Sequence, residues 1–445
     1  MTSEPPESTT APTIIPRNQH PISRKNISDN ALKVLYRLHK AGYSAYLVGG
    51  AVRDLLLDRH PKDFDITTDA SPEEVKKLFG NCRLIGRRFR LAHVIYGRDV
   101  IEVATFRGAH DEEDQQTSEH GMLLRDNVYG TLAEDAWRRD FRVNALYYNI
   151  ADFSLVDYTG GLADIHSKEL NVIGDPRERF MHDPVRMLRA VRFAAKLGFT
   201  IDRHSEEAIT SQGHLLKAIA PARLYDEGLK LFLSGNGLRS FELLRHYGLF
   251  GTLYPEVDAL LNQPESDNHR TLIENAFRNS DARIAADKPV TPAFLHAALL
   301  WGVVQQQLHS EQGRYNSPVE ALEQIGEQVA GRQQRYTSTP RRFVFQAREI
   351  WTMQQRLLRQ QQRSAIPLLQ NKRFRAAYDF LLLRAESGEP LQPLADWWTA
   401  LQSADPTAQQ QLFANPADNR TPRSRGPRRR KRKPAAVTAP ADPSD

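Results

Sequence analysis

The chain has 445 residues, of which 40% are hydrophobic and 26% are charged, with a net charge of +6 and a single cysteine, Cys82. This length predicts two or three domains, and one cysteine excludes an intramolecular disulfide and a cysteine-based zinc site. No run approaches the roughly 18 apolar residues of a transmembrane helix. The first 16 residues lack the charged and then apolar pattern of a signal peptide. We therefore expect a cytoplasmic protein that does not bind a membrane.

The positive charge is concentrated near the C-terminus. Residues 420–433 (RTPRSRGPRRRKRK) contain nine basic residues and no acidic one, and the rest of the chain has a net charge of −3. A segment of Arg, Lys, Pro and Gly has no apolar side chains from which to build a core. We predict that residues 411–445 are a disordered basic tail in which Arg428, Arg429 and Arg430 bind phosphates. A tail that only maintains solubility is the alternative.

The N-terminal part of the chain predicts a mixed α/β head over residues 26–165. Residues 1–25 are expected to be disordered, and Ser28 or Asp29 is expected to cap a helix that ends at Gly42. Short strands and helices follow: a strand at 44–48, a helix at 50–58, a strand at 63–67, a helix at 71–80 capped by Ser71, two strands of one hairpin at 82–97 and 98–108, a mobile polar loop at 108–125, and a helix followed by a strand at 131–150. After about residue 176 every strong pattern is helical, so an all-helical part extends to about residue 410.

Residues 47–66 (LVGGAVRDLLLDRHPKDFDI) contain the most informative pattern. Gly49 and Gly50 separate a short apolar strand from a helix, and Asp63 and Asp65 flank Phe64. Side chains alternate along a strand, so the two carboxylates point the same way and repel each other unless a cation lies between them. Either motif alone is more often an ordinary turn. Their order and spacing predict a site for Mg²⁺, with Mn²⁺ as the alternative, and for a triphosphate.

In this site, Asp63 and Asp65 are the predicted metal ligands. Gly49 and Gly50 allow the backbone to approach phosphates, and Arg53, one helical turn further, is expected to bind two phosphate oxygens.

The window resembles the nucleotidyltransferase signature in its GGxxRD form, which is typical of the family of bacterial poly(A) polymerases and tRNA CCA-adding enzymes. The segments CRLIGRRFRLAHV (82–94) and FRAAYDFLLLRAE (374–386) resemble the poly(A) branch of that family. The resemblance implies an α+β fold. A mixed-sheet, polymerase-β-like head forms the catalytic palm, a helical neck (166–235) binds the nucleotide base and RNA, and a helical body (236–410) binds RNA.

The resemblance also implies an activity. The expected reaction is template-independent polyadenylation in mRNA processing and decay: AMP is transferred from ATP to an RNA 3′-hydroxyl, and pyrophosphate is released by a two-metal mechanism. RNA would be held through its phosphates with low sequence specificity, in part by Arg87, Arg88 and Arg90. A CCA-adding tRNA nucleotidyltransferase is the first alternative, and a non-catalytic RNA-binding protein on a transferase fold is the second. Protein partners are not predicted.

Two further assignments come from family motifs. Two-metal chemistry usually uses three carboxylates, and the resemblance marks Asp140 in RRDF and Glu102 in VIEVATFR as the candidates. We predict Asp140, with Glu102 as the alternative. Asp183 and Arg186 match the motif EDxxR, whose Asp and Arg pair with the incoming base, although His182 replaces its Glu. Asp183 is also expected to be the N-cap of the helix that follows.

Overall fold

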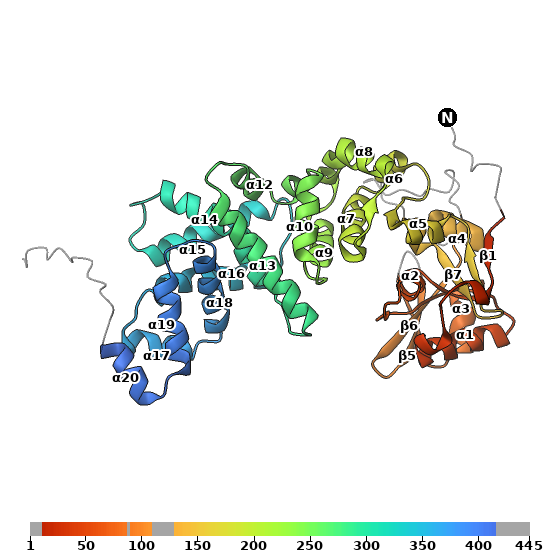
Figure 1. Ribbon diagram of the computed structural model, residues 1–445, viewed down its shortest axis with the longest axis horizontal. Helices are drawn as coiled ribbons and strands as arrows, with labels where there is room; N and C mark the ends of the chain where they lie inside the picture. Colours follow the sequence, from red (N-terminus) through yellow and green to blue (C-terminus); the bar gives the residue numbers. More distant parts are fainter. Residues whose placement is uncertain (1–10, 87–89, 109–128, 415–445) are drawn as a thin grey trace, which may run out of the picture.

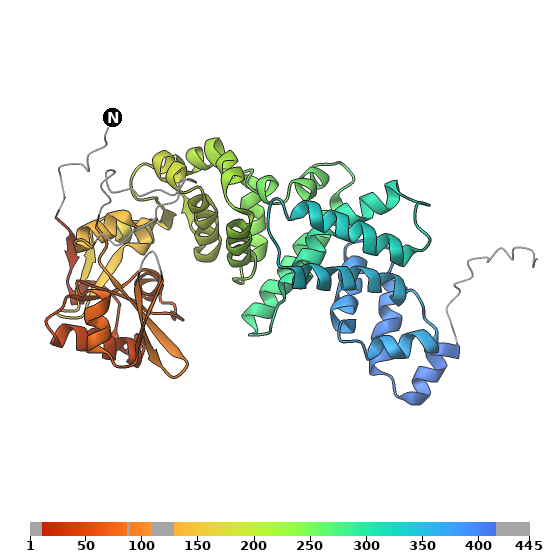
Figure 2. The same cartoon turned by 180° about the vertical axis from the view of Figure 1, so that it is seen from behind.

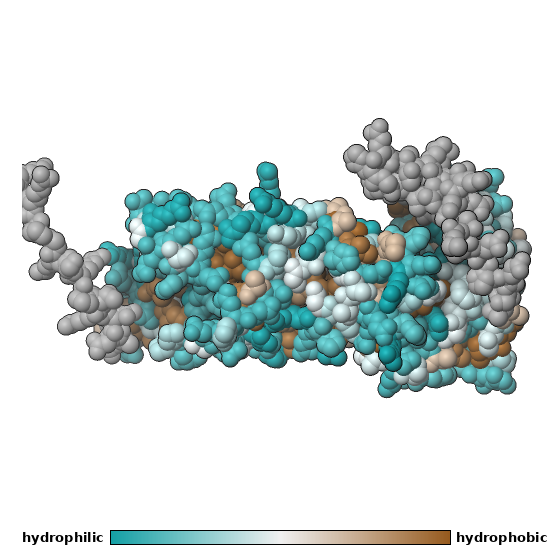
Figure 3. Space-filling model, turned by 90° about the horizontal axis from the view of Figure 1, so that it is seen from above, coloured by the Kyte–Doolittle hydropathy of each residue, from teal (hydrophilic) through white to brown (hydrophobic). Residues whose placement is uncertain are grey.

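The computed structural model describes residues 11–86, 90–108 and 129–414. Figures 1 and 2 show an elongated arch, with a mixed α/β head at one end and helices continuing to the other end. The predicted α+β class, with a mixed-sheet head followed by helices, is confirmed. The face seen in Figure 3 is mostly hydrophilic along its length. None of the helices in the described ranges is long and apolar enough to cross a lipid bilayer.

The head is built on an eight-stranded sheet with the strand order β1-β8-β7-β2-β3-β6-β5-β4. Its strands are β1 (Thr13–Ile15), β2 (Ala45–Val48), β3 (Asp65–Thr68), β4 (Cys82–Ile85), β5 (Leu91–Tyr96), β6 (Asp99–Thr105), β7 (Leu146–Asn149) and β8 (Leu155–Asp157). β3 and β6 run parallel, whereas β2 and β3 are antiparallel, with Val48 opposite Asp65. Because β2 ends where β3 begins, the residues after β2 and before β3 meet at one edge of the sheet.

Helices and short 3-10 turns complete the head. They are η1 (Arg17–Gln19), η2 (Arg24–Asn26), α1 (Asp29–Lys40), α2 (Gly50–Leu56), α3 (Pro72–Leu78), α4 (Leu132–Arg138), η4 (Arg142–Asn144) and α5 (Gly161–Ser167). The Ser28 hydroxyl accepts the Ala31 N–H, and Ser71 forms a complete capping box with Glu74. Both predicted helix starts are therefore confirmed, since side-chain oxygens satisfy backbone donors there.

Four expectations about the secondary structure are wrong. The disordered tail expected from residue 411 does not begin there, because α20 (Pro406–Ala414) is a helix. Disorder does not extend over residues 11–25, because β1 pairs with β8 and Ile22 is buried. The single strand expected at 82–97 is two strands, β4 and β5, which pair with each other; Gly86, directly after β4, has a φ of 98°. The apolar pattern continues on both sides of this turn and so conceals it. In the helical part, β10 (Thr200–Ile201) pairs in parallel with β9 (Glu169–Leu170).

The rest of the described chain is helical. Its helices are α6 (Pro176–His182), α7 (Val185–Leu197), α8 (Arg203–Gln212), η5 (Gly213–Ala218), α9 (Pro221–Phe232), α10 (Gly237–His246), α11 (Phe250–Leu253), α12 (Pro255–Leu261), α13 (Asp267–Ala285), α14 (Pro292–Ser310), α15 (Pro318–Gln333), α16 (Arg341–Leu357), α17 (Gln362–Leu369), α18 (Phe374–Glu386), α19 (Gln392–Ser403) and α20 (Pro406–Ala414). One cluster of buried apolar residues runs from the head to α18, and a second joins α16 to α19. The predicted domain boundaries stay predictions.

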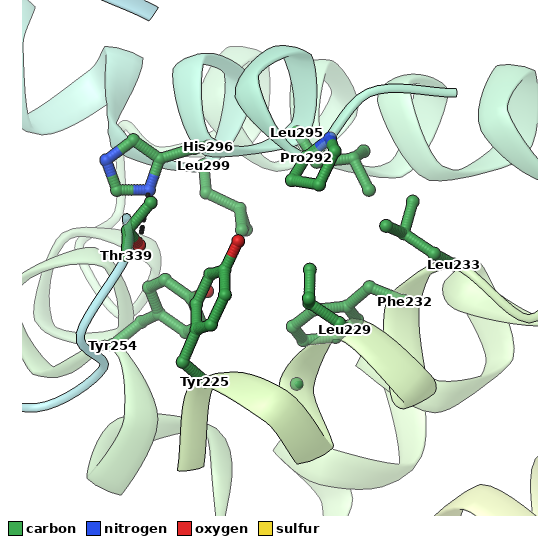
Figure 4. Close-up of a pocket in the computed structure, with 11 residues that line it drawn as sticks. Tyr225, Leu229, Phe232, Leu233, Tyr254, Pro292, Leu295, His296, Leu299 and Thr339 are labelled. Carbon is green, nitrogen blue, oxygen red and sulfur yellow. Dashed lines mark hydrogen bonds between the residues drawn. The ribbon is translucent and has the colours of Figure 1, made fainter. Parts of the chain in front are cut away.

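A small cavity lies between α9 and α14 (Figure 4). It measures about 30 Å³ and is lined by Tyr225, His296 and Thr339 among mostly apolar side chains. The Tyr225 hydroxyl and His296 Nε2 have no hydrogen-bond partner in the described part of the chain. Burial lowers the pKa of His296 to about 4, so the ring is neutral at neutral pH. A space of this size fits one water molecule and is too small for a nucleotide.

Candidate active site

A glycine in the left-handed region connects β2 to α2. Gly49 has a φ of 73° and a ψ of −134°, a conformation that residues with a Cβ atom rarely adopt. The Arg139 guanidinium lies beside this turn, because a Cβ atom built on Gly49 would be 3.6 Å from Arg139 Nη1. The turn therefore brings the backbone and a cationic side chain together where β2 ends.

Three carboxylates meet next to this turn. Asp65 opens β3, and Asp63 lies two residues earlier, just outside the strand. In the parallel pairing of β3 with β6, Ile66 aligns with Val103, so Glu102 is level with Asp65 on the neighbouring strand. Side chains at equivalent positions of paired strands project from the same face. The structure therefore brings Asp65 and Glu102 together, although 37 positions separate them in the numbering.

The electrostatics of this cluster are strongly negative. Asp65 is exposed at the sheet edge, yet the surrounding protein restricts water around its carboxylate, and this raises its pKa to about 6. The charges of Glu102 and Asp63 contribute to this rise, whereas the charge of Arg139 opposes it. Glu102 is itself close to a histidine, with Oε1 3.3 Å from His93 Nε2.

Within the described ranges, no group of three or more His, Cys, Asp or Glu side chains is arranged as a metal site. The donors nevertheless fit Mg²⁺, which prefers carboxylate oxygens, keeps several waters and needs only one or two carboxylates besides a phosphate ligand. The raised pKa of Asp65 has burial as its largest cause, but the charges of Glu102 and Asp63 also contribute to it, and a cation would balance those charges.

Asp140 lies in a different environment. Its Oδ1 accepts the Phe141 N–H at 3.0 Å, and its Oδ2 accepts Arg189 Nε at 2.8 Å. The charged groups that set the pKa of Asp65 include Glu102, and Asp140 is not among them. The geometry therefore brings Glu102 to Asp65, whereas Asp140 joins the head to α7.

Arg53 does not present its guanidinium as a phosphate fork. Its side chain is only 2% exposed, and both Nε and Nη2 donate to Asp54 Oδ1, at 2.8 and 2.6 Å. Nη1 donates to Asn144 Oδ1 at 2.6 Å, and the guanidinium lies over the Phe193 ring. The spacing of the motif cannot reveal this burial, because Asn144 and Phe193 are distant in the sequence.

Sequence reasoning missed a buried network around Arg139. Arg139 donates to Asp135 Oδ2 at 3.0 Å through Nη2 and to the Tyr147 hydroxyl at 3.0 Å through Nε, and Tyr147 donates to Asp135 at 2.8 Å. Burial raises the pKa of Tyr147 well above its usual value. The network holds Arg139 beside Gly49, and the RRDF motif was the available signal.

Arginines of α6 and α7 form a basic wall facing the head. Arg179 donates from Nη2 to the backbone carbonyls of Arg138 and Arg139, which joins α6 to the head. Burial is the main cause that lowers the pKa of Arg179 to about 10, and the charge of Arg186 contributes to the shift. Burial also lowers the pKa of Arg192, and the neighbouring Arg189 adds to that effect. Clustered arginines of this kind suit a surface that receives phosphates.

Asp183 and Arg186 each have another hydrogen-bond partner, although the charge of Asp183 acts on Arg186. Arg223 Nη2 donates to both oxygens of Asp183 at 2.9 Å, whereas Arg186 Nη1 donates to the Arg179 carbonyl at 2.9 Å. The expectation that Asp183 is the N-cap of α7 is wrong by one residue, because Pro184 occupies that position. Asp183 Oδ1 still accepts the Val185 N–H at 3.3 Å.

Of the residues predicted to bind RNA, the structure describes Arg90. It forms an exposed ion pair with Glu73 at 2.5 Å. Arg87, Arg88, Arg428, Arg429 and Arg430 lie outside the described residues.

Three family models and several curated proteins match this chain. Residues 45–171 match the Poly A polymerase head domain, residues 198–261 the probable RNA and SrmB-binding site of polymerase A, and residues 314–434 the polymerase A arginine-rich C-terminus. The chain is 48% identical to Poly(A) polymerase I of Salmonella typhimurium over 95% of this chain and 92% of that protein. It is 44% identical to Poly(A) polymerase I of Haemophilus influenzae over 90% of each chain.

Similarity to CCA-adding enzymes is weaker. The CCA-adding enzyme of Lactobacillus helveticus is 39% identical over 48% of this chain and 52% of that protein. The crystal structure of the Bacillus stearothermophilus CCA-adding enzyme in complex with CTP is 26% identical, covers 86% of this chain and 81% of its own, and has a TM-score of 0.55. The chain therefore belongs to the bacterial poly(A) polymerase I family of nucleotidyltransferases.

Proposed function

We propose that this enzyme adds AMP from ATP to RNA 3′ ends without a template, with Asp63, Asp65 and Glu102 as the catalytic carboxylates. The observation that carries the assignment is the meeting of these carboxylates beside the Gly49 turn at one sheet edge. Glu102 replaces Asp140 as the third carboxylate in this proposal, because Asp140 is engaged by Arg189.

The carboxylates and Arg139 would have different roles in catalysis. Asp63, Asp65 and Glu102 would hold Mg²⁺, which when bound lowers the pKa of the 3′-hydroxyl and balances the charge of the triphosphate and of the leaving pyrophosphate. Arg139 lies beside the turn at Gly49, where it would balance phosphate charge. The 3′-oxygen attacks the α-phosphorus in line with the departing pyrophosphate, so no covalent enzyme intermediate is needed.

RNA and the base of ATP would contact the helical part. The arginines of α6 and α7 cluster where these helices join the head, and such a cluster suits RNA and triphosphate. Asp183 and Arg186 would contact the adenine edge, as the EDxxR resemblance implies. Because phosphate contacts carry no sequence information, we expect low specificity for the RNA sequence.

A CCA-adding activity is the second candidate, because CCA-adding enzymes are more distant relatives of this chain. The test incubates the protein with Mg²⁺, each nucleoside triphosphate in turn, and either an unstructured RNA oligonucleotide or a tRNA without its CCA end. Long A tails on the oligonucleotide support polyadenylation. Three-nucleotide CCA addition confined to the tRNA would replace our proposal with the second candidate.

A further inference from the structure

Arg223, on α9, holds the carboxylate of Asp183 from the neighbouring helix. α7 and α9 pack side by side (Figure 1). Asp183 Oδ1 accepts from Arg223 and from the Val185 N–H, whereas Oδ2 accepts only from Arg223 among the hydrogen bonds of the described residues. A carboxylate offers about four lone-pair sites. Arg223 therefore fixes the orientation of Asp183 while Oδ2 keeps capacity for another donor.

Asp183 and Arg186 together offer an acceptor and a donor within one helical turn. The Arg186 N–H donates to the Asp183 carbonyl at 3.0 Å, so the two residues are the first and last of the turn that starts α7. One Nη1 donor of Arg186 is engaged by the Arg179 carbonyl. A guanidinium has five N–H donors, so others remain for a ligand.

The Watson–Crick edges of the four bases respond differently to such a pair. Adenine donates from its 6-amino group and accepts at N1, and cytosine donates from its 4-amino group and accepts at N3. Guanine and uracil have the opposite arrangement: a carbonyl oxygen accepts where adenine and cytosine donate, and a ring N–H donates where they accept. A carboxylate and a guanidinium can thus reject guanine and uracil strongly, because buried polar groups would be left unpaired. The same pair cannot distinguish adenine from cytosine, because both bases present one donor and one acceptor in the same arrangement.

The choice between adenine and cytosine must then depend on position. A purine places its Watson–Crick edge further from the ribose than a pyrimidine does. With the triphosphate fixed in the head, a carboxylate held in one place meets only one of these edges at hydrogen-bonding distance. The contact from Arg223 to both oxygens is the feature that holds this carboxylate.

We propose that Arg223 is a positioning residue that sets the preference for ATP over CTP. The proposal rests on the proposed function, in which Asp183 and Arg186 contact the base. Arg223 acts through Asp183 and does not touch the reacting atoms. Without Arg223, the Asp183 side chain keeps only the longer hydrogen bond from the Val185 N–H, at 3.3 Å, and can rotate toward the nearer edge of a pyrimidine.

The test measures kcat/KM for each of the four nucleoside triphosphates on one RNA primer with R223A, R223K and a control, R239A. Arg239 is similarly exposed and pairs with Glu242 on α10, outside this contact. For R223A we expect the ATP to CTP ratio to fall about tenfold, which is the effect of one charge-assisted hydrogen bond, while GTP and UTP stay rejected. The ATP to CTP ratio of R223K should lie between those of R223A and wild type, and the ratio of R239A should equal that of wild type.

Three results would overturn the inference. The ATP to CTP ratio of R223A could equal that of wild type, it could change equally in R239A, or discrimination against GTP and UTP could fall in parallel. Arg223 is half exposed, and thermal unfolding of each variant checks that the fold is kept. If wild type adds no AMP, the proposed function fails; if wild type makes A tails and one of these results appears, only the role of Arg223 fails.

Discussion

Arg53 is among the largest fully buried side chains of the molecule, and its charge is balanced inside the protein. Asp54 accepts two of its hydrogen bonds and Asn144 a third. A buried charge needs this kind of pairing, because removal from water is unfavourable for an isolated ion. Arg53 therefore fixes α2, which begins at the glycine turn, to the segment after RRDF.

For R53A, we predict that the free energy of unfolding falls by about 3–5 kcal/mol, because Asp54 and Asn144 lose their buried partner. Urea denaturation measures this change. R203A serves as the control, since Arg203 is 87% exposed and pairs only with Glu207. An R53A protein with unchanged stability and a raised KM for ATP would instead support the phosphate-binding role expected from the motif.

The second residue-scale prediction concerns Asp65 and pH. Its pKa in the folded protein is about 6, above the ordinary value of 3.8, so the folded state binds the proton more tightly than the unfolded state. The stability that this proton supplies is present below pH 3.8 and is lost as the pH rises through 6. D65N should therefore be more stable than wild type at pH 7.5 without metal, and its stability should change less between pH 4 and 6.

Thermal unfolding across this pH range, with and without Mg²⁺, measures both effects. Mg²⁺ should stabilise the wild type above pH 6 more than it stabilises D65N, because a ligand that binds the folded state shifts unfolding to higher temperature. Identical pH profiles for the two proteins would show that the pKa of the Asp65 carboxylate is not raised in the folded protein.

At the scale of elements, the parallel pair β3 and β6 brings Glu102 to Asp65, and the ion pair of Asp140 with Arg189 joins the head to α7. We predict different defects for E102Q and D140N. E102Q should lower kcat by about 10²-fold and require more Mg²⁺ for half-maximal rate, because a metal ligand is lost. D140N should keep the Mg²⁺ dependence and lower the stability, because Arg189 loses its partner.

Steady-state kinetics over a Mg²⁺ titration separate these two outcomes. The reverse pattern, with a shifted Mg²⁺ requirement in D140N and none in E102Q, would return Asp140 to the role of third carboxylate that the family motif suggested.

The elements that could be predicted are those with local signals. Ser28 and Ser71 cap their helices as expected, and the diglycine turn and the carboxylates of Asp63 and Asp65 lie at one edge because β2 and β3 pair antiparallel, with Val48 opposite Asp65. The pairing of Glu102 with Asp65 depends on strand register between separate segments. The contact of Arg223 with Asp183 depends on packing of two helices. Neither of these two contacts produces a periodic pattern in the sequence.

At the scale of the whole molecule, the head lies at one end of an arch of helices (Figures 1 and 2). The apolar core is continuous from the head to α18, so α6 and α7 are held against the head by packing as well as by Arg179 and Arg189. This arrangement places the arginines of α6 and α7 at the junction of the head with the helices, whereas Arg139 is the arginine whose charge acts on Asp65. RNA binding and nucleotide transfer should therefore depend on different residues and be separable by mutation.

The most direct test of the central claim measures AMP incorporation from ATP by wild type, D63N and D65N, together with the affinity of each protein for the same RNA primer. Loss of either carboxylate should lower incorporation by about 10²-fold to 10³-fold and leave RNA affinity nearly unchanged, because the proposed function places the RNA contacts on the arginine-rich helices. Incorporation at the wild-type rate by both variants would contradict the assignment of this sheet edge as the catalytic centre.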